Sequence, residues 1–259
     1  MMPELNDLEH LAREAGEILR ARFGQQLHIT HKSTIDLVTD ADHRSEAYLL
    51  GEIRRRFPGH KIVAEESGES VGADGQVWYI DPLDGTVNYA HGLPIFSVSI
   101  GFAAEGRMQL GVVYDPMRDE CFSAQAGLGA WLNGEPLCVS PAAELDQALL
   151  VTGFPYDIRT NPENNLDHYA RFALRSQGVR RLGSAALDVC YVAAGRFDGF
   201  WEIRMNAWDI AAGGLIAEQA GARVTNVAGG EDYLLPPQSI LAANPSLHAQ
   251  MLAVLNGQG

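Results

Sequence analysis

The sequence predicts a mixed α/β fold in which helices are layered on sheets. Two helical patterns open the chain, a run of short β-rich segments follows, and strand and helix patterns then alternate to the end. Strands of mainly antiparallel type between groups of helices are typical of domains built from packed layers. The chain has 259 residues, of which 46% are hydrophobic, so it can bury a large core. At ~150 residues per domain, this length favours one or two domains.

The helices are predicted by apolar periodicity and by their end signals. Near the N-terminus, apolar residues recur at steps of three and four, at Leu5, Leu8, Leu11, Ala15 and Ile18. A second helix is expected from about Thr39 to Phe57, because three arginines suit its C-terminal dipole and Pro58 follows. Later helices are expected at about 162–175, 207–220 and 245–255, the last with Asn244 as its N-cap.

The strands are predicted by short β-rich runs separated by Gly, Pro, Asp and Asn. In the first half these runs are 61–64, 77–80, 95–102, 110–114 and 121–123, and in the second half 149–151, 199–203 and 239–242. Ser140-Pro141 interrupts the pattern between the two groups. We therefore expect an N-terminal α+β half over residues 1–140 and a C-terminal α/β half over 141–259, which together could also form one domain.

Charge and composition narrow the functional classes. Lys plus Arg number 19 against 33 Asp plus Glu, giving a formal net charge of −14. So acidic a surface argues against nucleic-acid or anionic-membrane partners, which need a basic field. No apolar run approaches a membrane span of ~18 residues, and the N-terminus lacks a secretory pattern. The three cysteines suit neither disulfides nor a zinc site, so a reduced, cytoplasmic setting is expected.

The segment from Trp78 to Tyr89 carries the strongest chemical signal. An apolar strand runs into Asp81-Pro82-Leu83-Asp84-Gly85, and we expect the strand to end at Pro82, which lacks a backbone donor. Both carboxylates can then point into one space at the end of the strand, where they repel each other unless a proton or a metal lies between them. Oxygen ligands select hard cations such as Mg²⁺ or Mn²⁺. Alternatively, the two acids only form turns.

Other acidic residues follow strands or begin helices. Glu65 lies directly after the strand at 61–64, and Asp209 lies in the first turn of the helix at 207–220. Thr39 and Asp42 have the spacing of a capping box. A solvated turn, a favourable helix dipole and a cap are the ordinary alternatives for these residues. These alternatives explain each residue alone, but they do not readily explain why three strand ends or helix starts all carry carboxylates.

Taken together, these motifs resemble the inositol monophosphatase family. The matching segments run in family order and at family spacing over most of the chain. They are Leu37-Val38-Thr39-Asp40-Ala41-Asp42, Glu65-Glu66-Ser67, Asp81 to Tyr89, Gly183-Ser184-Ala185-Ala186 and Trp208 to Gly213. The combination is highly specific, although no single segment is.

The resemblance implies a layered αβαβα sandwich of the sugar-phosphatase type. It also implies Mg²⁺-dependent, lithium-sensitive hydrolysis of a phosphate monoester, with Mn²⁺ as a possible substitute ion and inositol monophosphate as the leading substrate. Two or three ions would be held by Glu65, Asp81, the Leu83 carbonyl, Asp84 and Asp209. Thr86, paired with Asp42, would orient the attacking water. Substrate contacts would come from Asp84, Gly85, Thr86, Gly183, Ser184, Ala185, Glu202 and Asp209.

The substrate and the biological role stay open at this point. Arg204 stands two residues beyond Glu202, where animal inositol phosphatases tend to carry a small residue, and it either binds a second anionic group or lies at a subunit edge. Fructose 1,6-bisphosphate, histidinol phosphate and phosphorylated adenosine nucleotides are therefore alternative substrates. A mainly regulatory, protein-binding role is a further alternative, because some bacterial members are suspected of roles with the transcription machinery. The resemblance also implies a homodimer.

Overall fold

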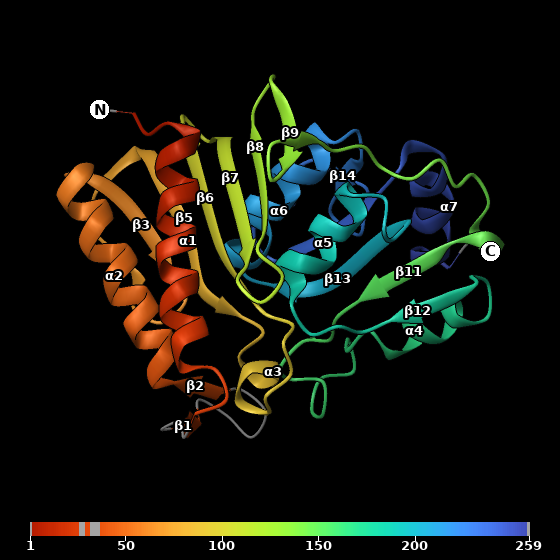
Figure 1. Ribbon diagram of the computed structural model, residues 1–259. Coiled ribbons are helices and arrows are strands. Elements are labelled where there is room, and N and C mark those ends of the chain that lie inside the picture. Colours follow the sequence, from red (N-terminus) through yellow and green to blue (C-terminus); the bar gives the residue numbers. More distant parts are fainter. Residues whose placement is uncertain (1, 26–28, 32–36, 258–259) are drawn as a thin grey trace.

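The chain folds into five layers in which helices and two large sheets alternate (Figure 1). The structure, a computed structural model, describes residues 2–25, 29–31 and 37–257. The layered α/β fold that the sequence predicts is confirmed.

The larger sheet is formed by residues 60–136. Its strands are β3 (His60–Ala64), β4 (Gly68–Glu69), β5 (Ala73–Asp84), β6 (Ser97–Ala104), β7 (Arg107–Asp115), β8 (Glu120–Gln125), β9 (Gly129–Leu132) and β10 (Glu135–Pro136). Their spatial order is β10-β9-β8-β7-β6-β5-β3-β4. Only β3 and β5 run parallel, and the other neighbours in this sheet are antiparallel. From β6 to β10, sequential antiparallel strands are joined by short turns, whereas β5 and β6 are joined by a longer segment that contains residues 86–90.

The smaller sheet is formed by the C-terminal half of the chain. Its strands are β11 (Leu149–Thr152), β12 (Gly178–Arg180), β13 (Gly199–Met205), β14 (Arg223–Thr225) and β15 (Gln238–Ala243), in the order β12-β11-β13-β15-β14. The β12-β11-β13 part is parallel and the rest antiparallel. Two short strands, β1 (Ile29–His31) and β2 (Leu37–Thr39), form a separate antiparallel pair.

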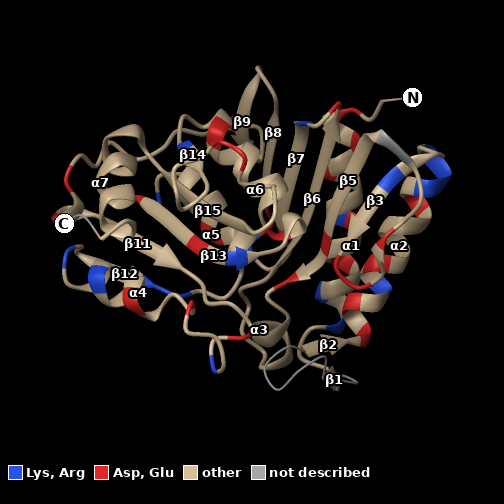
Figure 2. Cartoon of the chain, turned by 180° about the vertical axis from the view of Figure 1, so that it is seen from behind, with Lys and Arg blue, Asp and Glu red and all other residues tan. Residues whose placement is uncertain are grey.

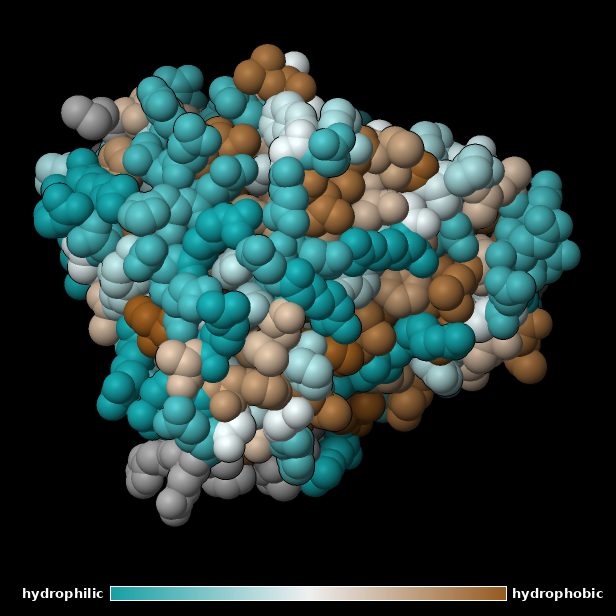
Figure 3. Space-filling view, in the orientation of Figure 1, coloured by the Kyte–Doolittle hydropathy of each residue, from teal (hydrophilic) through white to brown (hydrophobic). Residues whose placement is uncertain are grey.

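The helices make up the other three layers. The helices are α1 (Leu5–Arg22), α2 (Asp40–Arg56), α3 (Thr86–Ala90), α4 (Leu166–Ala173), α5 (Ala185–Ala193), α6 (Ala207–Gln219) and α7 (Pro245–Leu255). The first two cover the outer face of the larger sheet, α5 and α6 lie between the sheets, and α4 and α7 pack on the smaller sheet. Hydrophilic side chains cover the region of α1 and α2 in Figure 3. Among the described residues, no helix is long and apolar enough to cross a membrane.

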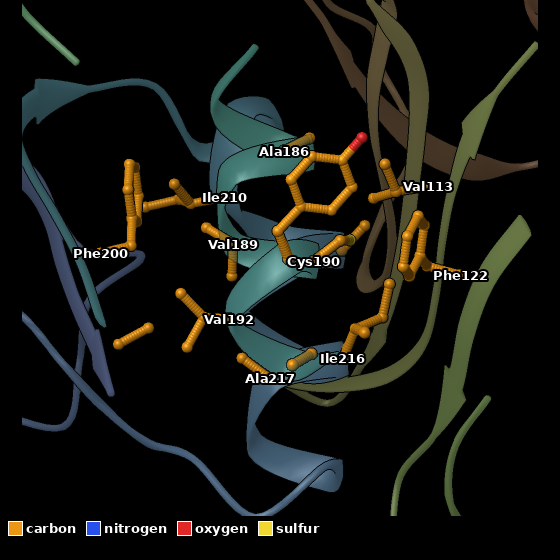
Figure 4. Close-up of a cluster of buried hydrophobic side chains, with 14 of the residues drawn as sticks. Val113, Phe122, Ala186, Val189, Cys190, Val192, Phe200, Ile210, Ile216 and Ala217 are labelled. Carbon is orange, nitrogen blue, oxygen red and sulfur yellow. The ribbon is translucent and has the colours of Figure 1, made fainter. Parts of the chain in front are cut away.

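Three hydrophobic cores fill the spaces between the layers, and the central core lies on both sides of α5 and α6. Successive residues of a strand point to opposite faces, so one strand serves two cores. On β7, Val112 packs toward α1 and α2, whereas Val113 packs toward α5 and α6. On β13, Phe200 packs toward α5 and α6, and Trp201 toward α4 and α7. Figure 4 shows α5 in the central core, with its Ala186, Val189 and Cys190 among side chains from both sheets.

The structure corrects the prediction that the strand carrying Asp81 ends at Pro82. Strand β5 continues to Asp84, and its register with β6 shifts between Asp81 and Asp84, as in a β-bulge. A bulge tolerates proline because the ladder is interrupted there.

Helix α5 was not predicted from the sequence, which gave only a turn at Gly183-Ser184-Ala185. Its residues are apolar on nearly every side because it lies between two sheets, so it has no amphipathic period to recognise. The helix expected at 162–175 is shorter than predicted, since α4 spans only Leu166–Ala173.

Helix α6 lies unusually close to the larger sheet because two strands carry glycine beneath it. Gly101 of β6 and Gly111 of β7 are directly paired across the ladder. A Cβ atom at Gly111 would lie 2.8 Å from the carbonyl oxygen of Ala212, and one at Gly101 would lie 3.2 Å from the Ala211 Cβ. The missing side chains thus set the distance between α6 and the sheet.

We predict that Gly111→Ala destabilises the protein by about 1–3 kcal/mol, because the new methyl group meets helix backbone that cannot rotate away. The measurement is the free energy of unfolding in urea. The matched control is Gly51→Ala in α2, where the site is exposed and no atom lies within 4 Å. There alanine should be neutral or stabilise by roughly 0.5–1 kcal/mol. Equal stability of the two variants would contradict the close packing of α6.

Candidate active site

The bulge in β5 turns two acidic side chains to the same side of the sheet. Residues three apart on a regular strand point to opposite faces. The register shift between Asp81 and Asp84 removes this alternation, and both side chains line one cavity. The Asp81 carboxylate also accepts the backbone N–H of Leu83 at 3.0 Å, and the Pro82 carbonyl accepts the Ser45 hydroxyl at 2.8 Å. The turn interpretation and the site interpretation therefore both apply to Asp81.

The cavity has a volume of about 430 Å³ and is lined by residues of both halves of the chain. Acidic positions lie where β5 runs toward α3 and along β13 (Figure 2). Of the residues predicted for metal or substrate, all line this cavity: Glu65, Asp81, Leu83, Asp84, Gly85, Thr86, Gly183, Ser184, Ala185, Glu202 and Asp209. The chain thus brings together residues more than one hundred positions apart.

Asp84 joins the two halves by hydrogen bonds to the start of α5. Its Oδ2 accepts the Ser184 hydroxyl at 2.6 Å and the Ala186 N–H at 2.8 Å, and its Oδ1 accepts the Ala185 N–H at 3.2 Å. The first N–H groups of a helix have no partner within the helix and carry partial positive charge. A carboxylate from the other half of the molecule satisfies them here.

Asp209 begins α6 and faces the cavity. Its Oδ2 accepts the backbone N–H of Asn206 at 2.8 Å, which forms a capping box. The Asp209 carboxylate therefore caps the start of α6, as the ordinary interpretation predicts. It also lines the cavity, where a ligand could reach it.

Thr86 and Asp42 form a buried pair beside the cavity. The Thr86 hydroxyl lies 3.0 Å from Asp42 Oδ1 and 3.0 Å from the Leu83 carbonyl oxygen. Asp42 Oδ2 accepts the N–H of Thr39 at 2.8 Å and its hydroxyl at 2.6 Å, so the expected capping box is present as well. Burial raises the pKa of Asp42, and the hydrogen bonds from Thr39 and Thr86 oppose this effect.

The acidic side chains around β5 destabilise one another's ionised forms. Burial raises the pKa of Asp81 well above its usual range, and the charges of Glu65, Asp84 and Asp209 raise it further. Burial likewise raises the pKa values of Asp84 and Asp209. In the described ranges, no three His, Cys, Asp or Glu side chains are arranged as a finished metal site. The donor set nevertheless fits a hard divalent cation, because it offers oxygen atoms only and carries charge that a cation would neutralise.

The opposite side of the cavity contains residues that the sequence analysis missed. Gly153, Arg181 and Asp188 line it together with Glu202. A Cβ atom at Gly153 would collide with the Glu202 carboxylate, so glycine is needed for that side chain to fit. Asp188 could have been found only after α5 had been recognised, because it lies one turn beyond the Gly183-Ser184-Ala185 motif.

Arg204 is engaged within the protein. Its guanidinium pairs with Asp157 at 2.6 Å, and its φ of 57° places it in the left-handed region at a bulge of β13. The side chain reaches the cavity wall but shares its charge with the Asp157 carboxylate. This pairing gives little support to Arg204 as the site of a second anionic group.

A family model described as the inositol monophosphatase family matches residues 3–258. The chain belongs to the inositol monophosphatase family. Nus factor SuhB of Escherichia coli K12 is 43% identical over 256 residues, covering 98% of this chain and 96% of the relative.

Two solved structures extend the comparison. The inositol monophosphatase of Anabaena (Nostoc) sp. PCC 7120 is 44% identical with a TM-score of 0.88, covering 98% of this chain and 95% of its own. SaIMPase-II, an inositol monophosphatase of Staphylococcus aureus, is 28% identical with a TM-score of 0.81, covering 97% of this chain and 93% of its own. It has been solved bound to inositol monophosphate and, separately, to 2′AMP.

We predict that Glu202 makes the metal-free protein less stable as the pH rises. Burial raises its pKa from 4.5 to about 8, although the Arg181 charge acts in the opposite direction. Between these values the folded state holds a proton that the unfolded chain has released, so stability falls with increasing pH, by on the order of 1–4 kcal/mol. Glu202→Gln should make the profile less steep between about pH 5 and about pH 8, while the other buried acids keep part of the slope.

The measurement is urea unfolding in EDTA at several pH values. Glu163→Gln, an exposed position in the loop before α4, is the matched control and should keep the wild-type slope. Identical slopes for Glu202→Gln and wild type would show that Glu202 does not hold this proton.

Proposed function

We propose that the protein hydrolyses a small phosphate monoester in a reaction that depends on divalent cations, with inositol monophosphate as the substrate. The observation that carries this proposal is that the four acids of the proposed metal site and Thr86 line one cavity, with Asp42 hydrogen-bonded to Thr86 beside it. Membership in the inositol monophosphatase family supports it.

In this proposal Mg²⁺ is held by Glu65, Asp81, the Leu83 carbonyl, Asp84 and Asp209, as two or three ions, and Mn²⁺ can substitute. Bound Mg²⁺ would polarise the phosphoryl oxygens, ease ionisation of water and stabilise the leaving oxygen. The cations also explain how a chain with a net charge of −14 receives an anionic substrate. Sensitivity to lithium, which the family resemblance implies, belongs to the same proposal.

The chain's own residues then position the reactants. The Thr86 hydroxyl has a single proton and two acceptors, Asp42 Oδ1 and the Leu83 carbonyl. When the Leu83 carbonyl serves as a ligand, the proton goes to Asp42, and the hydroxyl oxygen is left to accept a hydrogen bond from the attacking water. Asp42 lies at the end of this series of hydrogen bonds and can accept the proton. The backbone N–H groups of Gly85 and Thr86 contact phosphate, and Glu202 with Gly183, Ser184 and Ala185 contacts the alcohol.

The comparisons leave two other roles to be tested. SaIMPase-II binds both inositol monophosphate and 2′AMP in its solved structures, so a phosphorylated adenosine nucleotide is the second candidate substrate. Relatives named Nus factor SuhB favour a regulatory, protein-binding role as the second candidate function. We also propose a cytoplasmic homodimer, on the resemblance alone.

We predict that hydrolysis requires Mg²⁺, because without cations the acidic cluster repels the phosphate. Phosphate release should be measured for inositol monophosphate, 2′AMP, fructose 1,6-bisphosphate and histidinol phosphate, with Mg²⁺ and with excess EDTA. Turnover of inositol monophosphate should be fastest and should be lost in EDTA. Preference for another ester would change the substrate but not the chemistry, whereas no turnover of any ester would favour the regulatory role.

We predict that Thr86→Ala lowers kcat by ~10²–10⁴-fold while Mg²⁺ affinity stays within a few-fold of wild type. Asp42→Asn should cause a similar loss, and the double variant should be little slower than either single one, because the two side chains act as a unit. Steady-state kinetics over a range of Mg²⁺ concentrations provides the measurement.

Two variants separate this effect from helix capping. Thr86→Ser keeps the hydroxyl and should restore most of the rate. Asn244→Ala removes the cap of α7, which does not line the cavity, and should cost about 1 kcal/mol of stability or more with little effect on rate. Multiplicative rate losses in the Thr86 and Asp42 double variant would exclude a water-positioning pair.

A further inference from the structure

Helix α5 presents a second acidic residue to the cavity, one turn beyond the segment that binds Asp84. Residues three and four apart on a helix share a face. Accordingly Ser184, Ala185 and Asp188 line the cavity, while Ala186, Val189 and Cys190 pack into the central core (Figure 4). Asp188 therefore points away from the core and toward the space where a ligand binds.

The Asp188 side chain is buried, and one of its carboxyl oxygens has no hydrogen-bond partner. Its exposed fraction is 1%, and its Oδ1 has no partner among the described residues. Leaving a buried carboxyl oxygen unpaired is costly, and structures rarely keep such a group without a reason. An acid that only stabilised the N-terminus of α5 through the helix dipole could remain exposed to water, as Asp167 does in the first turn of α4. A ligand bound in the cavity is best placed to supply the missing hydrogen-bond partner.

The surroundings of Asp188 define what that partner is. Glu202 and Arg181 line the same cavity, and both influence the Asp188 carboxyl electrostatically. Burial raises the pKa of both carboxyls, so each offers acceptor oxygens and can also carry a proton, and a hydroxyl group, which both donates and accepts, matches either form. The Arg181 guanidinium offsets part of their charge and repels a second cation, so a neutral hydroxyl suits this place better than an ammonium group.

We propose that Asp188 is a specificity-determining residue that accepts hydrogen bonds from hydroxyl groups of the substrate's alcohol portion, beside Glu202. This inference rests on the proposed function and deepens it, since it gives the preferred substrate a polyol character. An ester whose alcohol has no hydroxyl group leaves the Asp188 oxygen unpaired and loses binding energy. Because Asp188 lies on α5 and not on β5, it selects the alcohol separately from the groups that act on phosphate.

The test compares Asp188→Asn with wild type on inositol monophosphate and on p-nitrophenyl phosphate, whose alcohol carries no hydroxyl. A hydrogen bond to a charged group corresponds to about 10- to 100-fold in affinity. The variant should lower kcat/KM for inositol monophosphate by this factor, mainly through KM, and at least tenfold more than for p-nitrophenyl phosphate. Deoxy analogues locate the contact, because the analogue lacking the bound hydroxyl should respond least to the substitution.

The matched control is Asp167→Asn, which removes an acid from the first turn of α4 and should not change the substrate ranking. Equal losses for the two esters, or an unchanged KM for inositol monophosphate, would overturn the role of Asp188. Thermal unfolding of each variant checks that the fold is retained.

A binding measurement keeps this inference separate from the proposed function. The dissociation constant of inositol monophosphate with Mg²⁺ is measured by calorimetry for Thr86→Ala and for the Thr86→Ala, Asp188→Asn double variant. A 10- to 100-fold weaker complex in the double variant supports the inference even if wild type turns over no ester, in which case only the proposed reaction fails. Equal dissociation constants, or no binding to either variant, would reject it.

Discussion

The close packing of α6 against the larger sheet is the constraint on which the cavity depends. Gly101 and Gly111 have no side chain at the point where α6 crosses β6 and β7, so the backbone of Ala212 approaches the sheet directly there. This packing places Asp209, at the start of α6, in the same cavity wall as Asp81. Hydrogen bonds from Ser184, Ala185 and Ala186 to Asp84 fix the neighbouring helix in the same way. The candidate site therefore forms only when both halves of the chain have folded together.

Electrostatics explains why such an arrangement needs a ligand. Burial raises the pKa values of Asp81, Asp84 and Asp209, so their ionised forms are destabilised in the folded protein. The cavity walls contain Arg181 and Arg204, but Arg204 is paired with Asp157. Divalent cations are the natural counter-charge for the acids around β5. In the proposed function, binding of the cations would restore the stability that the folded protein loses by bringing these acids together.

Much of the architecture could be predicted because the spacing of apolar residues along the sequence indicates which side of a helix or strand is buried. The helices α1, α2 and α7 each have a polar side or clear end signals, and they lie within a few residues of the predicted ranges. Helix α5 could not be predicted, since burial between two sheets removes its polar side and, unlike α6, it has no capping box at its start. The bulge at Pro82 was missed because its cause is the pairing of β5 with β6, which local sequence does not reveal. The acids around β5 were recognisable from their motifs, whereas Asp188 and Gly153 gain meaning only from tertiary packing.

The cavity is divided by chemistry as well as by secondary structure. In the proposed function, the acids and the Thr86 hydroxyl that would face phosphate come from β5, its flanking loops and the start of α6, while the groups that would face the alcohol come from β13, α5 and the segment after β11. A change at Glu202 or Asp188 can then alter which alcohol binds without moving the phosphate. SaIMPase-II, another member of the family, has been solved with inositol monophosphate and, separately, with 2′AMP. In the present chain Gly153 restricts this freedom, because any larger residue there would push Glu202 out of its place. The part of the cavity around Glu202 thus depends on the absence of a side chain at Gly153, just as the packing of α6 depends on Gly101 and Gly111.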